Sequence, residues 1–294
     1  MNTPPLPRPV QTALLAFLQN AFRHRPQDFR PLRLNGLPLG LLNAQWHNRL
    51  RQDWTGRLKT HSDGLSLETG DWHSTGQILQ DTARRWHQTG LLGGWRDEKH
   101  DVRDATGRVL FTLERAAFRP FGLTSRAVHL NGLCQTPDGL RLWIARRSPH
   151  KAVDPGKLDN LTGGGVAAGE TPAPAMRREA WEEAGIPPEL TPVPAETLLS
   201  VHPVKRGLHR EHLHIFDLQL PPGFTPQNQD GEVAAFTLMT PADTAAAIAQ
   251  GRMMNDSALV TLSLLHRLRL TTPDHPLAAF LQSFHSGAEG AKAV

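Results

Sequence analysis

The chain has 294 residues, enough to bury one large core or two modest ones, so two domains are the simplest expectation. Its formal net charge of +4 and pI near 9.7 are mildly basic, but no basic run is interleaved with aromatic residues and no zinc-finger spacing occurs. We therefore expect no nucleic-acid partner, and anionic phosphorylated small molecules explain the charge equally well.

Cysteine content and hydropathy bear on the cellular compartment. The single cysteine, Cys134, excludes an intrachain disulfide and a cysteine-based metal site. The apolar run 13–18 is too short for a signal sequence, and no run approaches membrane-spanning length. These features predict a cytoplasmic protein without a membrane partner, with an organelle-targeting extension left open.

Residues 1–121 are predicted to form a small α+β unit without chemistry of its own. Helical spacing of apolar residues predicts helices over 10–22, 44–53 and 75–89. Turn sequences, of which Asn35-Gly36 is the strongest, predict three hairpins. Their strands are expected at 32–34 with 37–42, 57–60 with 65–68, and 95–102 with 108–114.

Residues 122–294 are predicted to form a second, larger domain. Strands are expected at 126–134, 140–147, 197–202, 212–220 and 233–239, with a polar basic loop over 203–210. Helices are expected at 172–184, 243–250, 257–270 and 276–284. Asn255 or Asp256 is expected to cap the third of these helices.

The most informative stretch runs from Gly164 to Ile186. It matches the spacing Gx5Ex7REUxEExGU, in which U is an apolar residue. Thr171 is an acceptable N-cap and Pro172 suits the first helical position. Gly185 stands where a left-handed residue would end the helix. A helix over 172–184 follows.

This helix carries three carboxylates on one face. Glu179, Glu182 and Glu183 stand at i, i+3 and i+4, and the preceding loop delivers Glu170 nearby. Like charges so close repel by roughly 0.2–0.5 kcal/mol per pair, so a cation is expected among them. An all-carboxylate cluster suits Mg²⁺, with Mn²⁺ as a substitute, and suits zinc poorly.

The complete spacing resembles the motif of the Nudix hydrolases. The resemblance implies an α-β-α sandwich, a mixed sheet between helices, here preceded by the small α+β domain. It implies that the metal ligands are Glu179, Glu182, Glu183, the Gly164 carbonyl and, from outside the helix, Glu232. In the same motif Arg178 orients the glutamates and Glu170 stabilises the loop-helix junction. The base that activates water is expected to be Glu182 or Glu232.

Further runs resemble one subgroup that has an N-terminal extension and is related to the Nudix part fused to thiamine pyrophosphokinase in some fungi. These runs are 95–98, 114–117, 128–132, 151–160, 211–221 and 230–233. Arg126-Ala127 departs from the pattern, which has a Gly-rich or aromatic pair there. The candidate phosphate-binding residues are Arg146, Lys157 and Arg206.

These observations lead to three hypotheses. The first is a Mg²⁺-dependent hydrolase that converts thiamine diphosphate, or its oxo and oxy damaged analogues, to the monophosphate plus phosphate. The second is a Nudix hydrolase of a nucleoside diphosphate linked to another group. The third is a Nudix-fold sensor that binds such a ligand without cleaving it, although a sensor has no need of the full glutamate set. The resemblance also makes a homodimer an expectation.

Overall fold

The computed structural model describes residues 4–285. Within them, a mixed seven-stranded sheet has the order β11-β12-β7-β8-β13, with β10 paired to β7 and β9 to β8. The β12–β7 pair is parallel and the other pairs are antiparallel. The strands are β7 (Ser125–Thr136), β8 (Gly139–Arg147), β9 (Leu158–Asp159), β10 (Thr162–Gly165), β11 (Val193–Val204), β12 (Gly207–Leu220) and β13 (Val233–Met239).

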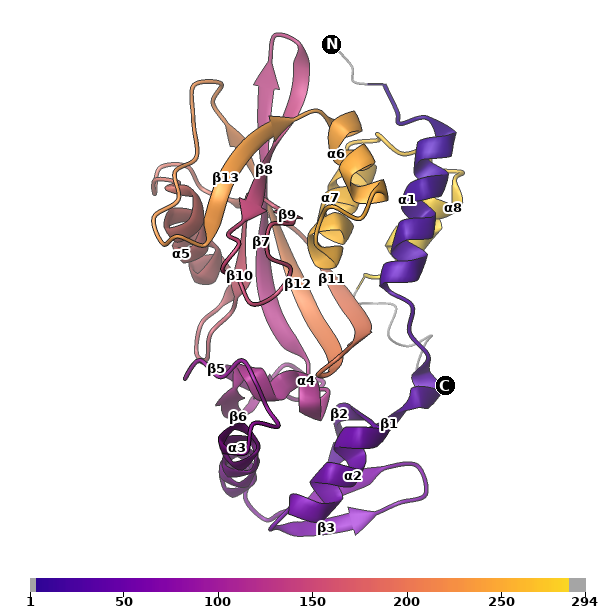
Figure 1. The fold of residues 1–294 in the computed structure, drawn as a ribbon, viewed down its shortest axis with the longest axis vertical. Helices are drawn as coiled ribbons and strands as arrows, with labels where there is room; N and C mark the ends of the chain where they lie inside the picture. The colour runs from indigo at the N-terminus through magenta and orange to yellow at the C-terminus, as the bar shows by residue number, and fades with distance from the viewer. Residues whose placement is uncertain (1–3, 286–294) are drawn as a thin grey trace.

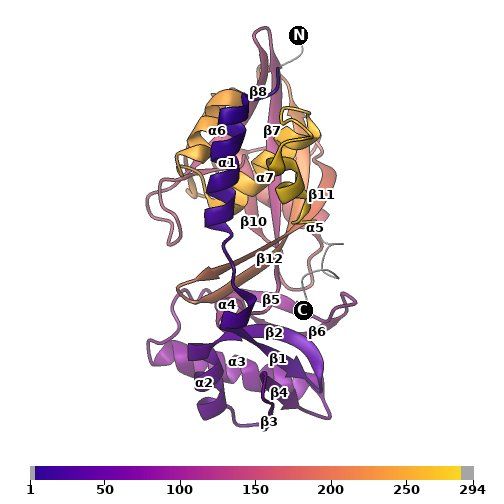
Figure 2. The same cartoon turned by 90° about the vertical axis from the view of Figure 1, so that its right-hand side faces the viewer.

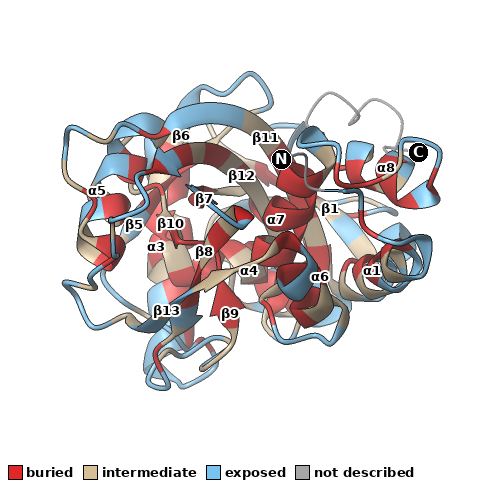
Figure 3. Cartoon of the chain, turned by 90° about the horizontal axis from the view of Figure 1, so that it is seen from above, coloured by how far each residue is buried: buried red, intermediate tan, exposed pale blue. Residues whose placement is uncertain are grey.

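Helices cover both faces of this sheet, as expected for an α-β-α sandwich. One face packs against α5 (Pro172–Ala184), and the other against a group of helices (Figure 1). The group consists of α1 (Arg8–Ala21), α6 (Pro241–Ala249), α7 (Asn255–Arg267) and α8 (Pro276–Gln282). Buried residues occupy nearly the whole length of α7, which lies at the centre of this group (Figure 3).

A smaller α+β region lies at one end of the sandwich (Figure 1). Its four-stranded sheet has the order β2-β1-β4-β3, and a separate β5–β6 hairpin packs beside it. The strands are β1 (Phe29–Leu34), β2 (Leu37–Asn43), β3 (Arg57–Thr60), β4 (Leu65–Glu68), β5 (Lys99–Arg103) and β6 (Val109–Glu114). The helical segments are α2 (Ala44–Asp53), α3 (Trp72–Gln88) and α4 (Phe118–Phe121), with short 3-10 turns at Pro26–Asp28 and Arg115–Ala117.

Local signals in the smaller region give its hairpins the expected positions. Asn35 and Gly36 have φ of 50° and 80°, the left-handed backbone that the two-residue turn requires. They place Leu34 opposite Leu37 in the register. Strands β3 and β4 and helix α2 have the predicted bounds, whereas β5 begins at Lys99 rather than at residue 95.

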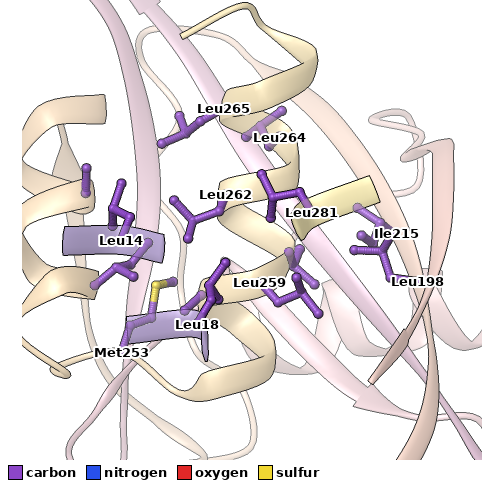
Figure 4. Close-up of a cluster of buried hydrophobic side chains, with 14 of the residues drawn as sticks. Leu14, Leu18, Leu198, Ile215, Met253, Leu259, Leu262, Leu264, Leu265 and Leu281 are labelled. Atoms are coloured by element: carbon purple, nitrogen blue, oxygen red, sulfur yellow. The ribbon is translucent and has the colours of Figure 1, made fainter. Parts of the chain in front are cut away.

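Helix α1 does not pack with the rest of the N-terminal segment. Leu14 and Leu18 are fully buried among α6, α7 and α8 in the core of the larger unit (Figure 4). Figure 2 shows α1 beside these helices and the smaller region below them. The expected unit 1–121 assigns α1 to the smaller region. The packing of α1 contradicts this assignment, because its apolar face packs against the C-terminal helices.

Two local expectations for the larger unit are wrong. The basic segment 203–210 is not a loop: β11 and β12 run through it, with Val204 opposite Gly207. Gly207 has φ of +133°, and a Cβ there would lie 2.1 Å from the Arg119 carbonyl oxygen, so the hairpin end packs against α4. Neither Asn255 nor Asp256 caps α7, because Met254 holds the N-cap position and no side chain caps the helix.

In the described part of the chain, every helix is too short or too polar to cross a membrane.

Candidate active site

Helix α5 is set by its ends and by its buried face. Gly185 ends the helix with φ of 61°, as the sequence predicts. Thr171 has the extended backbone of an N-cap, but its side chain makes no capping hydrogen bond. Ala175, Met176 and Ala180 are buried against the sheet, and this leaves the glutamates on the faces beside β10 and the 227–232 loop.

Arg178 gathers three of the motif carboxylates. Its Nη1 donates to Glu179 Oε1 at 2.7 Å and to Glu182 Oε2 at 3.1 Å, and its Nη2 donates to Glu170 Oε2 at 3.0 Å. The hydrogen bond that Arg178 donates to Glu170 is the main reason that the pKa of Arg178 lies above its usual value. Burial raises the pKa of Glu179, even though Arg178 opposes the shift. Arg178 therefore fixes the directions of these carboxylates.

Glu183 belongs to a second acidic group. Its Oε2 accepts a hydrogen bond from the Gly163 N–H at 2.9 Å. Its carboxylate lies close to those of Asp230 and Glu232, with one oxygen of each within 4.8 Å of the others. Burial, helped by the charge of Asp159, raises the pKa of Glu183 to about 8. Below that pH a cation must displace the proton of this carboxyl group.

The loop before β13 brings Asp230 and Glu232 to the helix. The Gln229 N–H donates to Glu182 O at 2.9 Å, and the Gln227 N–H donates to Ala184 O at 3.0 Å. These bonds satisfy free carbonyls in the last turn of α5 and fix the loop there. The Glu232 N–H in turn donates to Asp230 Oδ1 at 2.8 Å.

Gly164 makes the approach of the helix to β10 possible. A Cβ at Gly164 would lie 2.0 Å from Glu179 Cδ, closer than any two such atoms can come. The motif glycine is therefore required by the position of Glu179, and its carbonyl lies on the same short strand.

The residues present fit a hard divalent cation. The donors of the Glu183 group are all carboxylate oxygens, the chemistry that Mg²⁺ and Mn²⁺ prefer. Lys151 already brings a positive charge to the group: its Nζ contacts Glu232 Oε2 and lies 3.9 Å from Glu183 Oε1. Glu183 and Glu232 would hold the cation together with Asp230, while Arg178 holds Glu179 and Glu182 next to them.

The three predicted phosphate-binding residues do not gather at the carboxylates. Arg146 is exposed and donates to Gly156 O at 3.3 Å, and Lys157 pairs with Asp154 at 3.0 Å. Arg206 lies in the β11–β12 turn, where its Nη1 donates to Gly93 O and its own carbonyl accepts from Trp46 Nε1 at 2.9 Å. Arg206 thus joins the two units of the chain.

Sequence reasoning missed the cations that do lie near Glu183. Lys151 is one, and its pKa is lowered by burial despite the nearby Glu183. Arg147 is the other, and it pairs with Asp159, whose charge acts on Glu183; its Nη1 lies 2.8 Å from Asp159 Oδ2. Strand alternation could have distinguished Arg147 from Arg146, since neighbouring residues of β8 point to opposite faces of the sheet. In the sequence, Asp230 was noted only as a neighbour of Glu232.

A second group of metal-capable side chains lies elsewhere, between the β11–β12 hairpin and α7. It consists of His202, His209 and Asp256, with His209 Nε2 3.0 Å from Asp256 Oδ2. Arg119 Nη2 stands 3.2 Å from His209 Nδ1. Because an arginine can only donate, Nδ1 is an acceptor and the ring proton sits on Nε2, facing Asp256. We therefore interpret this group as a buried polar network that joins α4, β12 and α7.

The chain is similar to known proteins that carry a Nudix domain. The NUDIX domain model matches residues 126–257. Nudix hydrolase 24, chloroplastic, of Arabidopsis thaliana is 36% identical over 195 residues, covering 64% of this chain and 52% of that protein. A Nudix hydrolase of Deinococcus radiodurans is 31% identical over 160 residues, covering 54% of this chain and 89% of that protein. A crystal structure from Deinococcus radiodurans superposes with a TM-score of 0.46 and 27% identity, covering 56% of this chain and 98% of that one.

The chain belongs to the Nudix hydrolase family. Proteins of this family generally use divalent metal ions and act on small molecules. The chain spans about half the length of the Arabidopsis relatives that it matches, 52% of one and 50% of another.

Proposed function

We propose that this protein is a Mg²⁺-dependent hydrolase that cleaves the diphosphate of thiamine diphosphate, or of its oxo and oxy analogues, to the monophosphate and phosphate. The observation that carries the hydrolase part is the grouping of Glu183, Asp230 and Glu232, with oxygens within 4.8 Å of one another, next to the Arg178 cluster. When bound, a divalent cation would neutralise phosphoryl oxygens and lower the pKa of a coordinated water.

The residues of the chain have separate tasks in this proposal. Glu179 and Glu183 are largely buried, with 13% and 7% of their side chains exposed, and serve as fixed ligands together with Asp230. Glu182 and Glu232 are further proposed ligands. They have 42% and 39% of their side chains exposed and can reach a water molecule, so either can also act as the base. Arg178 keeps Glu179 and Glu182 oriented, with Glu170 behind it. The Gly164 carbonyl completes the proposed ligand set.

The assignment of thiamine compounds as substrates rests on the runs of residues that resemble the thiamine-related subgroup. Two of these runs, 95–98 and 114–117, contact each other in the smaller region: the Arg115 N–H donates to Glu98 O at 2.9 Å, and the Arg96 N–H donates to Glu114 Oε1 at 3.2 Å. A Cβ at Gly165, in the motif glycine segment, would lie 3.6 Å from Glu98 Oε1. Glu98, in one of these runs, is therefore next to the glycine segment of the proposed site.

Turnover of a substrate panel tests the proposal. Purified protein with Mg²⁺, and then with Mn²⁺, would be offered thiamine diphosphate, its oxo and oxy forms, ADP-ribose, NADH, coenzyme A and nucleoside triphosphates, with detection of monophosphate products. We expect the highest kcat/KM for a thiamine compound. Turnover of nucleotides alone would refute the thiamine assignment and favour the second hypothesis. Binding of one compound without any cleavage would favour a sensor.

Four accompanying proposals concern the protein as a whole. We propose that a boundary near residue 121 separates the units 1–121 and 122–294, except that α1 belongs by its packing to the second unit. We propose a homodimer, which light scattering of the purified protein tests. We keep a cytoplasmic location as a proposal, to be tested by imaging, since the Arabidopsis relatives are named chloroplastic. We also propose no nucleic-acid partner, to be tested by gel shift.

A further inference from the structure

The segment that links β10 to α5 is held from outside the larger unit. Strand β5 of the smaller region runs beside it (Figure 1). The Ala168 N–H donates to Lys99 O at 2.8 Å, and the Gly169 N–H donates to Asp101 Oδ1 at 3.1 Å. A Cβ at Gly165 would lie 2.9 Å from His100 Cε1, so the segment and β5 are in close contact.

Asp101 is the polar centre of this contact. Only 6% of the residue is exposed. Besides the Gly169 N–H, its carboxylate receives Arg103 Nη2 at 2.7 Å and Arg126 Nη2 at 3.2 Å. Arg126 Nη2 also donates to Glu170 O at 3.2 Å, so one guanidinium bridges the two units. Removing the carboxylate would leave a largely buried arginine without its charge partner, which is costly.

Direct contacts continue from this bridge to the proposed metal ligands. Glu170, whose carbonyl Arg126 holds, also receives Arg178 through Nε at 3.3 Å and Nη2 at 3.0 Å. Arg178 then donates to both Glu179 and Glu182. Every link is a hydrogen bond between named atoms, and the chain of links begins in the smaller region.

We propose that Asp101 is a positioning residue for the carboxylates of α5, acting through Arg126 and Glu170, so that the smaller region is a working part of the metal site. The inference rests on the proposed metal-dependent hydrolysis. Outer partners of metal ligands typically change metal affinity or activity by about 10–100-fold when they are removed. Asp101 stands further out, in a different unit of the chain, and is linked to Glu179 and Glu182 through Arg126, Glu170 and Arg178.

The bridge also gives Arg126 a partner at the position where this chain departs from the subgroup's pattern. An arginine stands at position 126, where a Gly-rich or aromatic pair is expected. Its partner, Asp101, lies in the N-terminal extension. Without Asp101, Arg126 would be a largely buried charge without its ion-pair partner.

Metal binding by purified variants tests the proposal. Mn²⁺ affinity would be measured by titration calorimetry, with no substrate present, in wild type, Asp101→Asn, Arg126→Met and the double variant. Asp104→Asn is the matched control, because Asp104 lies in the turn of the same hairpin and accepts hydrogen bonds from Thr106 and Arg108 of that turn. Melting temperatures would be recorded for all of them.

We expect Asp101→Asn and Arg126→Met each to weaken Mn²⁺ binding by about tenfold or more, with the control unchanged. The double variant should lose no more than the larger single loss, because both substitutions break one bridge. If Asp101→Asn does not fold, Arg126→Lys serves instead: it keeps the charge, is too compact to bridge both oxygens, and should show an intermediate loss.

Mn²⁺ affinity within twofold of wild type in a folded Asp101→Asn or Arg126→Lys protein would overturn the inference. So would additive losses in the double variant. Failure of the proposed function looks different: the wild-type protein would then hydrolyse no compound of the substrate panel, whatever the Mn²⁺ affinities of the variants.

Discussion

Gly164 and Glu179 are in such close contact that a Cβ on the glycine would lie 2.0 Å from the Glu179 carboxyl carbon. The first residue of the motif must therefore be glycine because of the side chain of Glu179, which comes fifteen positions later in the sequence. Short β10 and helix α5 can approach only because that position has no side chain.

Gly164→Ala should therefore displace Glu179 and lower kcat. A misplacement of about 1 Å in an active site can cost about 10²-fold in rate, and we expect a loss of that order. Gly223→Ala is the control, since a Cβ at Gly223 meets no atom within 4 Å. Steady-state kinetics of both variants check the prediction, and equal kcat in the two would contradict it.

Glu183→Gln should abolish most turnover while the fold survives. The amide has nearly the same volume and its oxygen can still accept the Gly163 N–H, but it lacks the charge that a divalent cation needs. We expect kcat to fall by several orders of magnitude. Glu189→Gln, at an exposed position just beyond the helix, should match wild type. Circular dichroism and single-turnover assays provide the measurements.

Metal binding should strengthen as the pH rises towards 8. Glu183 has a raised pKa of about 8, so below that pH a cation must displace its proton. We expect the Mn²⁺ dissociation constant to decrease between pH 6 and 8 and to level off above. Calorimetry in buffers of different ionisation heat would also show proton release. A Mn²⁺ dissociation constant that does not change with pH would contradict the raised pKa of Glu183.

The stability of the EDTA-treated protein should instead decrease as the pH rises towards 8. The pKa of Glu183 is raised from 4.5 to about 8 in the folded protein, so between these values the folded state holds a proton that the unfolded state has released. Its contribution to stability is complete below pH 4.5 and is lost as the pH rises through 8. The melting temperature should drop over this window in wild type and less in Glu183→Gln.

Lys151→Met should change metal and substrate binding in opposite directions. The ammonium contacts Glu232 and lies 3.9 Å from Glu183, where it competes with a cation for the same oxygens. Without it we expect Mn²⁺ to bind more tightly, because no ammonium competes with it, and the KM for the diphosphate to rise, because a positive charge beside the proposed site is lost. Each change should be about threefold, the size expected for a partly exposed ion pair. Lys151→Arg, which keeps the charge, should resemble wild type. A lower KM in Lys151→Met would contradict the prediction.

Leu18→Ala should destabilise the larger unit, although Leu18 lies near the N-terminus. The side chain is fully buried among α6, α7 and α8, and such truncations cost about 2–5 kcal/mol. Hydrogen exchange should increase in α7 more than in α3. Leu37→Ala, at a side chain that is 54% exposed, should cost about 0.5 kcal/mol or less. Faster exchange confined to α3 would place α1 with the smaller unit instead.

Several features of the fold and site could be predicted because their causes are local. The bounds of α5 follow from Pro172 and Gly185, and the Asn35-Gly36 turn follows from two residues that accept positive φ. The i, i+3 and i+4 spacing puts the glutamates on neighbouring faces whatever surrounds the helix. These features need contacts over only a few residues.

Other features were decided by tertiary structure. Sequence patterns suggested Arg206 as a phosphate ligand, but the hairpin that carries it packs against α4 and the smaller region. Lys151 and Asp230 reach Glu183 only because the β8–β9 and β12–β13 loops end at the same edge of the sheet as α5.

The sequence alone determined the carboxylate helix, its glycine cap and the acidic character of its glutamate face, since neighbouring residues fix all three. Only the tertiary structure decided that α1 packs on the C-terminal helices, that Asp230 and Lys151 join Glu183, and that Asp101 holds Arg126. Each of these depends on segments far apart in the chain, whose meeting depends on how the whole sandwich buries its apolar faces rather than on any local pattern.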